Sequence, residues 1–239
     1  MRERLSAGVS RATARAAARQ VASRVLTYPD DRLLDELGLL RSAVEAPGML
    51  PDGTREPLAQ VLEHIRATPL GEQQRQYVAT FDLRKRCCLY LTWWAHGDTR
   101  NRGYALVGFK QAYRNAGMEP PRNELPDHLA VVLEFAAAGD PEAGEALLCE
   151  HRPGLELLRQ ALHKAASPYA GAVDAVCATL PHASADVAAA AQRIAAAGPP
   201  AELVGLEGAG PQPIQLQPYD PHRRGSEPFG TNLDGAVSR

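Results

Sequence analysis

Two short polar segments, 96–103 and 124–129, contain the residues best suited to chemistry. Their sequences are H-G-D-T-R-N-R-G and E-L-P-D-H-L. The candidate functional residues in them are a histidine from each segment, two arginines and an aspartate: His96, Arg100, Arg102, Asp127 and His128. Histidine can act as a general base or as a pH-sensitive hydrogen-bonding group near neutral pH. Both segments also have a purely structural interpretation, because glycine suits the end of a helix and Pro-Asp suits its start.

Established catalytic and metal-binding motifs are missing from the chain. The stretch 103–110 resembles a phosphate-binding loop, but its lysine comes one position late and no Ser or Thr follows it. Cys87 and Cys88 are adjacent, which is poor spacing for zinc, and the other two cysteines are solitary. We therefore predict no catalytic residue, no metal site and no cofactor. A small helical enzyme with a histidine general base remains an alternative.

Aromatic residues are concentrated in one part of the chain. Eight of the thirteen lie between residues 77 and 113, including both tryptophans. Tyr77 and Phe81 are four positions apart and share a helix face. Trp93 and Trp94 point about 100° apart on a helix, so both cannot face the same core. An aromatic cluster is most often core, but the doubled tryptophan also favours a groove for a peptide or a cofactor.

The elements that must position these residues are helices. The chain contains 41 alanines among 239 residues, and no alternating segment bounded by hairpin turns is evident. We predict an all-α, single-domain helical bundle over 25–197. A basic and frayed helix over 1–24 precedes it, and a flexible Gly/Pro-rich tail over 198–239 follows it. The helices expected from apolar spacing and capping residues cover 30–42, 57–67, 71–95, 102–116, 127–138, 142–150, 155–166, 168–180 and 184–197.

Charge and hydropathy exclude several classes of protein. The net charge of -2 argues against a basic nucleic-acid binder, and no apolar run reaches the length of a membrane span. The chain lacks the apolar segment of a secretory signal, and four unpatterned cysteines fit a reducing compartment, so we expect a cytoplasmic protein. A helical DNA-binding regulator is a second alternative, supported only by the arginine-rich start and by the run 84–86.

Several of these segments together carry a resemblance to a known family. They are Y-P-D at 28–30, Q-Y-V-A-T-F-D at 76–82, H-G-D-T-R-N-R-G at 96–103, E-L-P-D-H-L at 124–129 and L-E-F at 133–135. In order and spacing the chain resembles the NarJ family, the delta subunits that serve as assembly chaperones of respiratory nitrate reductase. The resemblance covers about residues 25–180 and excludes the basic N-terminal stretch and the tail.

The resemblance implies a non-catalytic, all-helical redox-enzyme maturation chaperone. Its partner would be the apo form of the catalytic alpha subunit of nitrate reductase, bound through the N-terminal tail. The chaperone would keep that subunit competent for molybdenum cofactor insertion and delay its docking to the membrane. It would not be part of the finished enzyme. Molybdenum cofactor biosynthesis proteins are further partners that the resemblance suggests.

Binding of the N-terminal tail of the alpha subunit as an amphipathic helix requires a groove. We predict that the groove is lined by seven aromatic side chains: Tyr77, Phe81, Tyr90, Trp93, Trp94, Tyr104 and Phe109. The polar rim that fixes the register of the bound tail would be formed by His96, Arg100, Asp127 and His128, and Arg102 completes the predicted partner-binding set. A histidine at the rim would make the affinity sensitive to pH.

Overall fold

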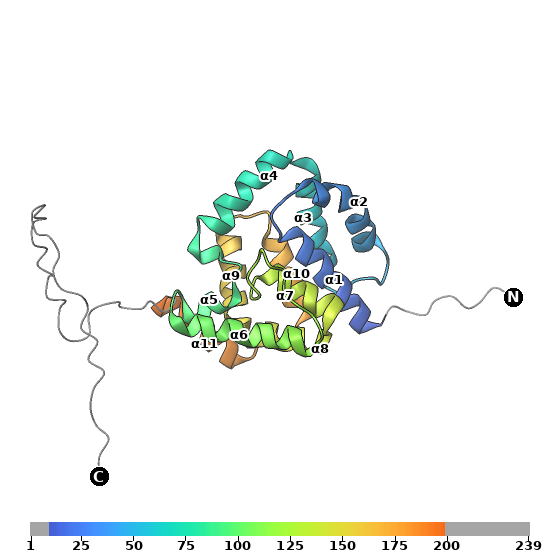
Figure 1. The fold of residues 1–239 in the computed structure, drawn as a ribbon. Helices are drawn as coiled ribbons and strands as arrows, with labels where there is room; N and C mark the ends of the chain where they lie inside the picture. The colour runs from blue at the N-terminus through green and yellow to red at the C-terminus, as the bar shows by residue number, and fades with distance from the viewer. Residues whose placement is uncertain (1–9, 199–239) are drawn as a thin grey trace, which may run out of the picture. The chain divides into compact units, whose positions relative to one another are not determined.

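The computed structural model of the chain describes residues 10–198, which form a bundle of helices joined by short loops (Figure 1). The prediction of an all-α fold is confirmed. The predicted tail, apart from its first residue, and residues 1–9 of the predicted N-terminal helix lie outside the described residues. The helices in chain order are α1 (Arg11–Val25), α2 (Asp31–Glu45), α3 (Arg55–Ala67), α4 (Leu70–Tyr77), η1 (Val78–Asp82), η2 (Lys85–Cys87), α5 (Leu91–His96), α6 (Arg100–Asn115), α7 (Leu129–Glu134), η3 (Phe135–Gly139), α8 (Pro141–Glu150), α9 (Arg152–Lys164), α10 (Ala170–Thr179) and α11 (Ala185–Ala197).

Helix α1 lies at the centre of the bundle, in contact with α7, η3 and α10 (Figure 1). The sequence predicted a frayed helix with a solvated basic face, and this prediction is wrong. Alanines 14, 18 and 22 are buried on one face of α1, together with Val21 and Val25. Small side chains at this spacing let neighbouring helices approach closely, so α1 becomes part of the core rather than an appendage.

Helices α3 and α10 also pack closely, and a glycine makes this possible. A Cβ atom added to Gly171 would lie 2.4 Å from the carbonyl oxygen of Pro57. Any larger residue at this position would push α10 away from α3. Leu58, Val61 and Leu62, predicted as the inward face of α3, are all buried in the same core.

The helix predicted over 71–95 is interrupted, and this is the main error in the sequence-based elements. Helix α4 ends at Tyr77 and continues as the π-helical segment η1, and Arg84 then adopts an extended conformation (φ -113°, ψ 97°). The chain next forms the short 3₁₀ helix η2 before α5 begins. Local propensity favoured a continuous helix, but tertiary hydrogen bonds override it.

Those hydrogen bonds join the segment before α5 to the E-L-P-D-H-L segment. The amide of Leu91 donates to the carbonyl of Asp127 (3.0 Å), and the amide of Leu129 donates to the carbonyl of Leu89 (2.8 Å). Tyr90 and His128 form an isolated antiparallel bridge between them. Because the carbonyl of Leu89 and the amide of Leu91 are used across the molecule, a continuous helix cannot pass through residues 89–90, and α5 begins at Leu91.

Candidate functional site

A cavity of 650 Å³ lies where the C-terminal end of α1, the α4–η1 segment, the extended residues before α5 and the start of α7 meet. We call it the aromatic cleft. It is lined by Ser23, Arg24, Thr27, Tyr28, Asp30, Arg32, Tyr77, Phe81, Asp82, Leu89, Tyr90, Pro121, Asn123, Glu124, His128, Ala130, Val131 and Glu134. Four of the twelve predicted partner-binding residues are among them: Tyr77, Phe81, Tyr90 and His128.

The floor of the aromatic cleft is a cluster of packed rings. Tyr77 and Phe81 lie one turn apart at the junction of α4 and η1, with ring centroids 4.8 Å apart. Tyr28 stacks edge-on against Tyr77 at 5.5 Å and remains half exposed, at 50 %. The hydroxyl of Tyr77 donates to the carbonyl of Leu26 (3.0 Å), which fixes the ring and ties the end of α1 to the floor. An apolar ligand side chain would therefore meet a rigid aromatic surface with one accessible ring.

Tyr90 and His128 form one wall of the aromatic cleft. Their rings lie 5.2 Å apart, edge to face, and the hydroxyl of Tyr90 donates to Oε1 of Glu124 (3.0 Å). The sequence placed His128 on an exposed first turn, whereas the structure buries it and makes it the N-cap of α7. Its Nδ1 accepts the amide hydrogen of Ala130 (3.3 Å), an arrangement that requires a neutral imidazole at that nitrogen.

Burial also lowers the pKa of His128, against the opposing influence of the carboxylates Glu124, Asp127 and Asp82. The free-energy cost of transferring a charged imidazole from water into this site exceeds the stabilisation that the neighbouring carboxylates provide. His128 is therefore neutral at pH 7, and the net charge of the cleft at that pH is decided by its carboxylates and arginines.

Asp127 lies behind this wall and does not line the cleft. The sequence assigned it to the first turn of its own helix, but α7 begins two residues later, and Asp127 instead caps α5. Its Oδ2 accepts from the amide (3.1 Å) and the hydroxyl (2.5 Å) of Thr92, while its other oxygen has no hydrogen-bond partner within residues 10–198. The carboxylate is fully buried, so its role in this geometry is to hold α5 against the segment that carries His128.

Arg102 supports the same wall from α6. Its guanidinium lies 5.4 Å from the centroid of the Tyr90 ring and donates to the hydroxyl of Thr92 (3.3 Å). It also lies within ion-pairing distance of Asp98 (3.5 Å) and Asp127 (3.9 Å). Arg102 positions Tyr90 from behind, by cation–π and hydrogen-bonding contacts.

The rim of the aromatic cleft is acidic. Arg24 donates to both Asp30 (2.7 Å) and Glu36 (2.6 Å), and Arg32 donates to Glu36 (2.7 Å). Both arginines of the cleft are thus neutralised by neighbours. Asp82 and Glu134 are exposed and form no ion pair with any residue in 10–198. The free carboxylates give the rim a negative charge that attracts a basic ligand.

The other predicted residues do not line the aromatic cleft. Trp94 and Phe109 are buried: the indole Nε1 of Trp94 donates to the carbonyl of Cys88 (3.2 Å), and Phe109 packs on His151. Gly154 is required beside Trp94, because an added Cβ atom would lie 2.7 Å from its ring. The single trough predicted from the sequence is therefore incorrect in its geometry, and these two rings belong to the core.

The remaining members of the predicted set lie on other surfaces. Trp93 is half-buried against Trp94, and His96 is half-buried at the end of α5. Arg100 and Tyr104 are exposed on α6, where Tyr104 is 78 % exposed.

Sequence reasoning missed the acidic rim and Tyr28 as parts of the cleft. Tyr28, Asp82, Glu124 and Glu134 all lie within or beside the segments that carried the family resemblance, so their presence in those segments was the available signal. Their convergence depends on contacts between elements far apart in the chain. Hydrophobic periodicity within one segment contains no information about such contacts.

No cluster of three or more His, Cys, Asp or Glu side chains in residues 10–198 is arranged to bind a metal ion. Of the helices in the same range, none combines the length and the apolar character needed to cross a bilayer.

Comparison with known proteins assigns the sequence to a family. The sequence profile described as "Nitrate reductase delta subunit" matches residues 48–175, which is more than half of the chain. The chain belongs to the nitrate reductase delta subunit family. The resemblance read from the sequence motifs is thereby confirmed, and both the α4–η1 floor and the Tyr90–His128 wall of the aromatic cleft fall inside the matched region.

Individual relatives show how far the similarity extends. The nitrate reductase-like protein NarX of Mycobacterium tuberculosis is 47 % identical over 161 residues, which is 67 % of this chain and 24 % of NarX. The probable nitrate reductase molybdenum cofactor assembly chaperone NarJ of Bacillus subtilis is 32 % identical, over 66 % of this chain and 85 % of that protein. The NarJ chaperone of Escherichia coli K12 is 31 % identical, over 63 % of this chain and 64 % of that protein.

These relatives differ in length. The chain spans about a quarter of the length of the NarX proteins that it matches, and most of the length of the Bacillus NarJ. The family relationship therefore applies to a delta-subunit region that is found both as a separate chaperone and as one part of a larger protein.

Proposed function

We propose that this delta-subunit chain is a non-catalytic, cytoplasmic chaperone that binds the N-terminal tail of the apo alpha subunit of respiratory nitrate reductase. It would keep that subunit competent for molybdenum cofactor insertion and delay its docking to the membrane subunit. Membership of the delta subunit family and the printed names of the NarJ relatives support the chaperone role. Molybdenum cofactor biosynthesis proteins would meet the complex at the insertion step.

The observation that carries the proposal is the aromatic cleft, which combines an aromatic floor with free carboxylates at its rim. This combination suits an amphipathic client segment that carries apolar anchors beside lysine or arginine. Tyr77 and Phe81 would receive an apolar anchor, while Asp82 and Glu134 would receive the basic side chains. Tyr28 is the accessible ring that would cover the anchor after it enters.

The experiment is titration calorimetry of the full chain with a peptide of the first forty or so residues of a nitrate reductase alpha subunit. The variant Tyr28→Ala removes an exposed ring from the cleft, so it tests contact without disturbing the core. We expect it to weaken peptide binding about ten-fold, because an aromatic anchor at an interface contributes on the order of 1–2 kcal/mol.

The matched control is Tyr104→Ala, which removes an exposed tyrosine from α6, away from the cleft. Unchanged affinity in Tyr104→Ala together with a loss in Tyr28→Ala supports binding at the aromatic cleft. The reverse pattern would return the site to the α6 surface that the sequence analysis included. No saturable binding by the unaltered chain would reject the proposal.

The two alternatives from the sequence make different predictions. A DNA-binding regulator requires salt-dependent binding of duplex DNA, which a net charge of -2 does not favour. An enzyme with His96 or His128 as general base requires a free ring nitrogen facing a substrate. The Nδ1 atom of His128 is occupied by the cap of α7, and this observation favours the chaperone.

A further inference from the structure

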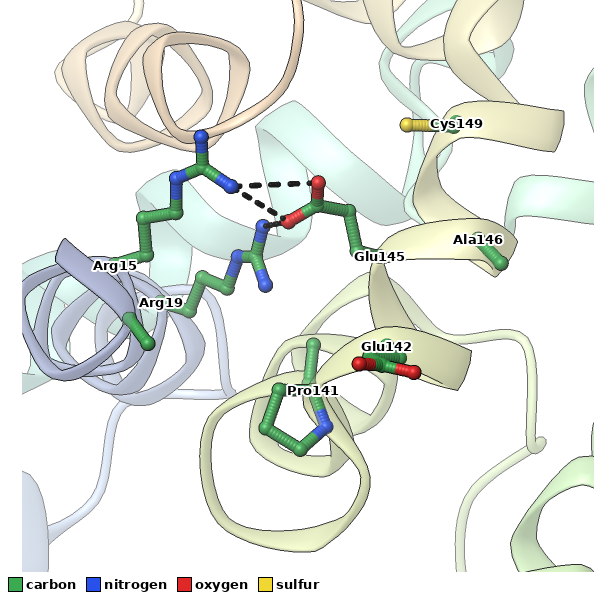
Figure 2. A pocket seen from close by; sticks show the side chains of 9 residues that line it. Arg15, Arg19, Pro141, Glu142, Glu145, Ala146 and Cys149 are labelled. Atoms are coloured by element: carbon green, nitrogen blue, oxygen red, sulfur yellow. Dashed lines mark hydrogen bonds and ion pairs between the residues drawn. The ribbon is translucent and has the colours of Figure 1, made fainter.

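A second cavity lies beside α1, near the end opposite to the aromatic cleft. It has a volume of 480 Å³ and lies between α1, η3 and α8 (Figure 2). We call it the arginine pocket. It is lined by Ala12, Arg15, Arg19, Ala136, Pro141, Glu142, Glu145, Ala146 and Cys149. It shares no residue with the aromatic cleft.

Two guanidinium groups in the arginine pocket converge on a single carboxylate. Arg15 and Arg19 lie one turn apart on α1, and both point toward Glu145 of α8 (Figure 2). Arg15 Nη1 lies 3.2 Å and Arg19 Nη2 lies 2.5 Å from the same Oε2 atom. Since two positive charges face one negative charge, the contact keeps a local excess of one positive charge.

The buried guanidinium still has a free donor. Arg19 is 2 % exposed, and its Nε donates to the hydroxyl of Thr179 (3.2 Å) while Nη2 serves Glu145. Its Nη1 makes no hydrogen bond with any residue in 10–198, and Figure 2 shows that nitrogen turned away from Glu145 toward Pro141. This nitrogen is not one of the buried unpartnered atoms of residues 10–198, so solvent reaches it, and an acceptor atom in the pocket would replace water in a charge-assisted hydrogen bond.

The rest of the pocket is small and apolar. Ala12, Ala136, Pro141 and Ala146 provide methyl and ring carbons and no polar side-chain group. Glu142 lies at the exposed rim and adds a second carboxylate to the lining, away from the contact of Glu145 with the two arginines. The pocket thus joins a cationic end to an apolar wall.

We propose that the arginine pocket binds a small organic anion, with a carboxylate or phosphate group at Arg15 and Arg19 and a compact apolar body against the alanine and proline side chains. Glu145 occupies one nitrogen of each arginine, Arg15 Nη1 and Arg19 Nη2, and acts as an internal competitor that turns outward when the ligand enters. Glu145 is 26 % exposed, so its side chain has solvent on the side toward which it would turn. This site is separate from the client-binding cleft and does not depend on the proposed function.

The test is calorimetric titration of the full chain with benzoate and with phenyl phosphate, which carry the same apolar ring and different anionic groups. We expect saturable binding of at least one, and the stronger of the two identifies the anionic group. Benzyl alcohol, a neutral analogue, should not bind. Inorganic phosphate that binds as tightly as phenyl phosphate would indicate an adventitious ion only and would overturn the proposal, as would the absence of saturable binding by both anions.

Three variants locate the site. Arg15→Ala removes a half-exposed guanidinium, 43 % exposed, and should weaken binding about ten-fold or more. Arg11→Ala removes the same charge from the same helix outside the pocket, and should leave binding unchanged. Equal weakening by both changes would show general electrostatic attraction and would overturn the site.

The third variant, Glu145→Gln, tests whether Glu145 competes with the anion for the two arginines. It weakens the internal competitor while keeping its shape, so binding of the anion should become tighter. Weaker or unchanged binding in a variant that retains its helical circular dichroism would contradict the role of Glu145. Binding of the alpha-subunit peptide should be the same in all three variants, which separates the failure of this proposal from the failure of the proposed function.

Discussion

The two cavities beside α1 differ in electrostatic character although arginines of the same helix line both. In the aromatic cleft, Arg24 is held by two carboxylates, and other carboxylates remain free. In the arginine pocket, Arg15 and Arg19 share one carboxylate, and positive charge remains. The charge that a cavity presents therefore depends on how its ion pairs are distributed, and not on how many arginines line it.

The largest effect should come from breaking the polar contacts that hold the wall of the aromatic cleft. Asp127→Ala leaves the amide and hydroxyl of Thr92 without their acceptor in a fully buried site. We expect the free energy of unfolding to fall by about 3–4 kcal/mol, measured by urea denaturation. Asp98→Ala is the control, since Asp98 is exposed and contacts Arg102 only at 3.5 Å. Equal losses would show that Asp127 is not the residue that holds this wall.

The next effect concerns the ion pairs of the arginine pocket. Glu145→Ala removes the carboxylate from the buried Arg19, and we expect a loss of about 2–3 kcal/mol in the free energy of unfolding. Glu134→Ala, which removes an unpaired carboxylate at the cleft rim, should change it by less than about 0.5 kcal/mol. Similar values for the two variants, measured by urea denaturation, would remove the distinction between paired and unpaired carboxylates on which the comparison rests.

A smaller effect tests the charge of the two cavities by ligand binding. Glu134→Lys reverses one rim charge and should weaken binding of the alpha-subunit peptide about five- to ten-fold at low salt. Glu142→Lys makes the same change at the rim of the arginine pocket and should leave peptide affinity unchanged. Calorimetry at two salt concentrations checks both, since the difference should shrink as salt increases. A persistent difference at high salt would mean that shape rather than charge is responsible.

The smallest effect is a pH dependence of stability. Burial lowers the pKa of His128 and of His151 below the ordinary value of 6.5. The unfolded chain therefore binds more protons than the folded chain just below pH 6.5, so stability is full above about pH 7 and falls as the pH decreases toward the lowered pKa. His128→Asn keeps a capping oxygen and removes this titration.

We expect His128→Asn to reduce the loss of stability between pH 7.5 and pH 5.5 by about 1 kcal/mol or less, measured by urea denaturation at each pH. His182→Asn replaces an exposed histidine and serves as the control. A pH profile of His128→Asn that coincides with that of the unaltered chain would assign the dependence to other groups.

The sequence was sufficient where local rules decide the outcome. Asp30 and Ser184 are the first residues of two helices predicted from the sequence, and both accept from the amide three residues later. The leucine spacing of residues 57–67 identified the buried face of α3. Such features depend on neighbours within one or two turns, so a single segment contains the necessary information.

The sequence was insufficient where distant segments compete for the same backbone groups. Nothing within residues 71–95 shows that Leu89 and Leu91 hydrogen-bond to residues near 128, and this pairing is what interrupts the predicted helix. Helix geometry predicts that Trp93 and Trp94 face different surroundings, and they do. It does not predict that Trp94 is the one that enters the core. The acidic rim was missed because its charge depends on which arginines are already paired.

A π-helical segment contributes to each cavity, η1 to the aromatic cleft and η3 to the arginine pocket. A π turn contains one more residue than an α turn, and it therefore sets the angular phase of every side chain that follows. Deleting one residue from η1 would allow a regular helix to form and would rotate Asp82 by about 100° around the axis. The direction in which Asp82 points at the rim of the aromatic cleft thus depends on a single residue of η1.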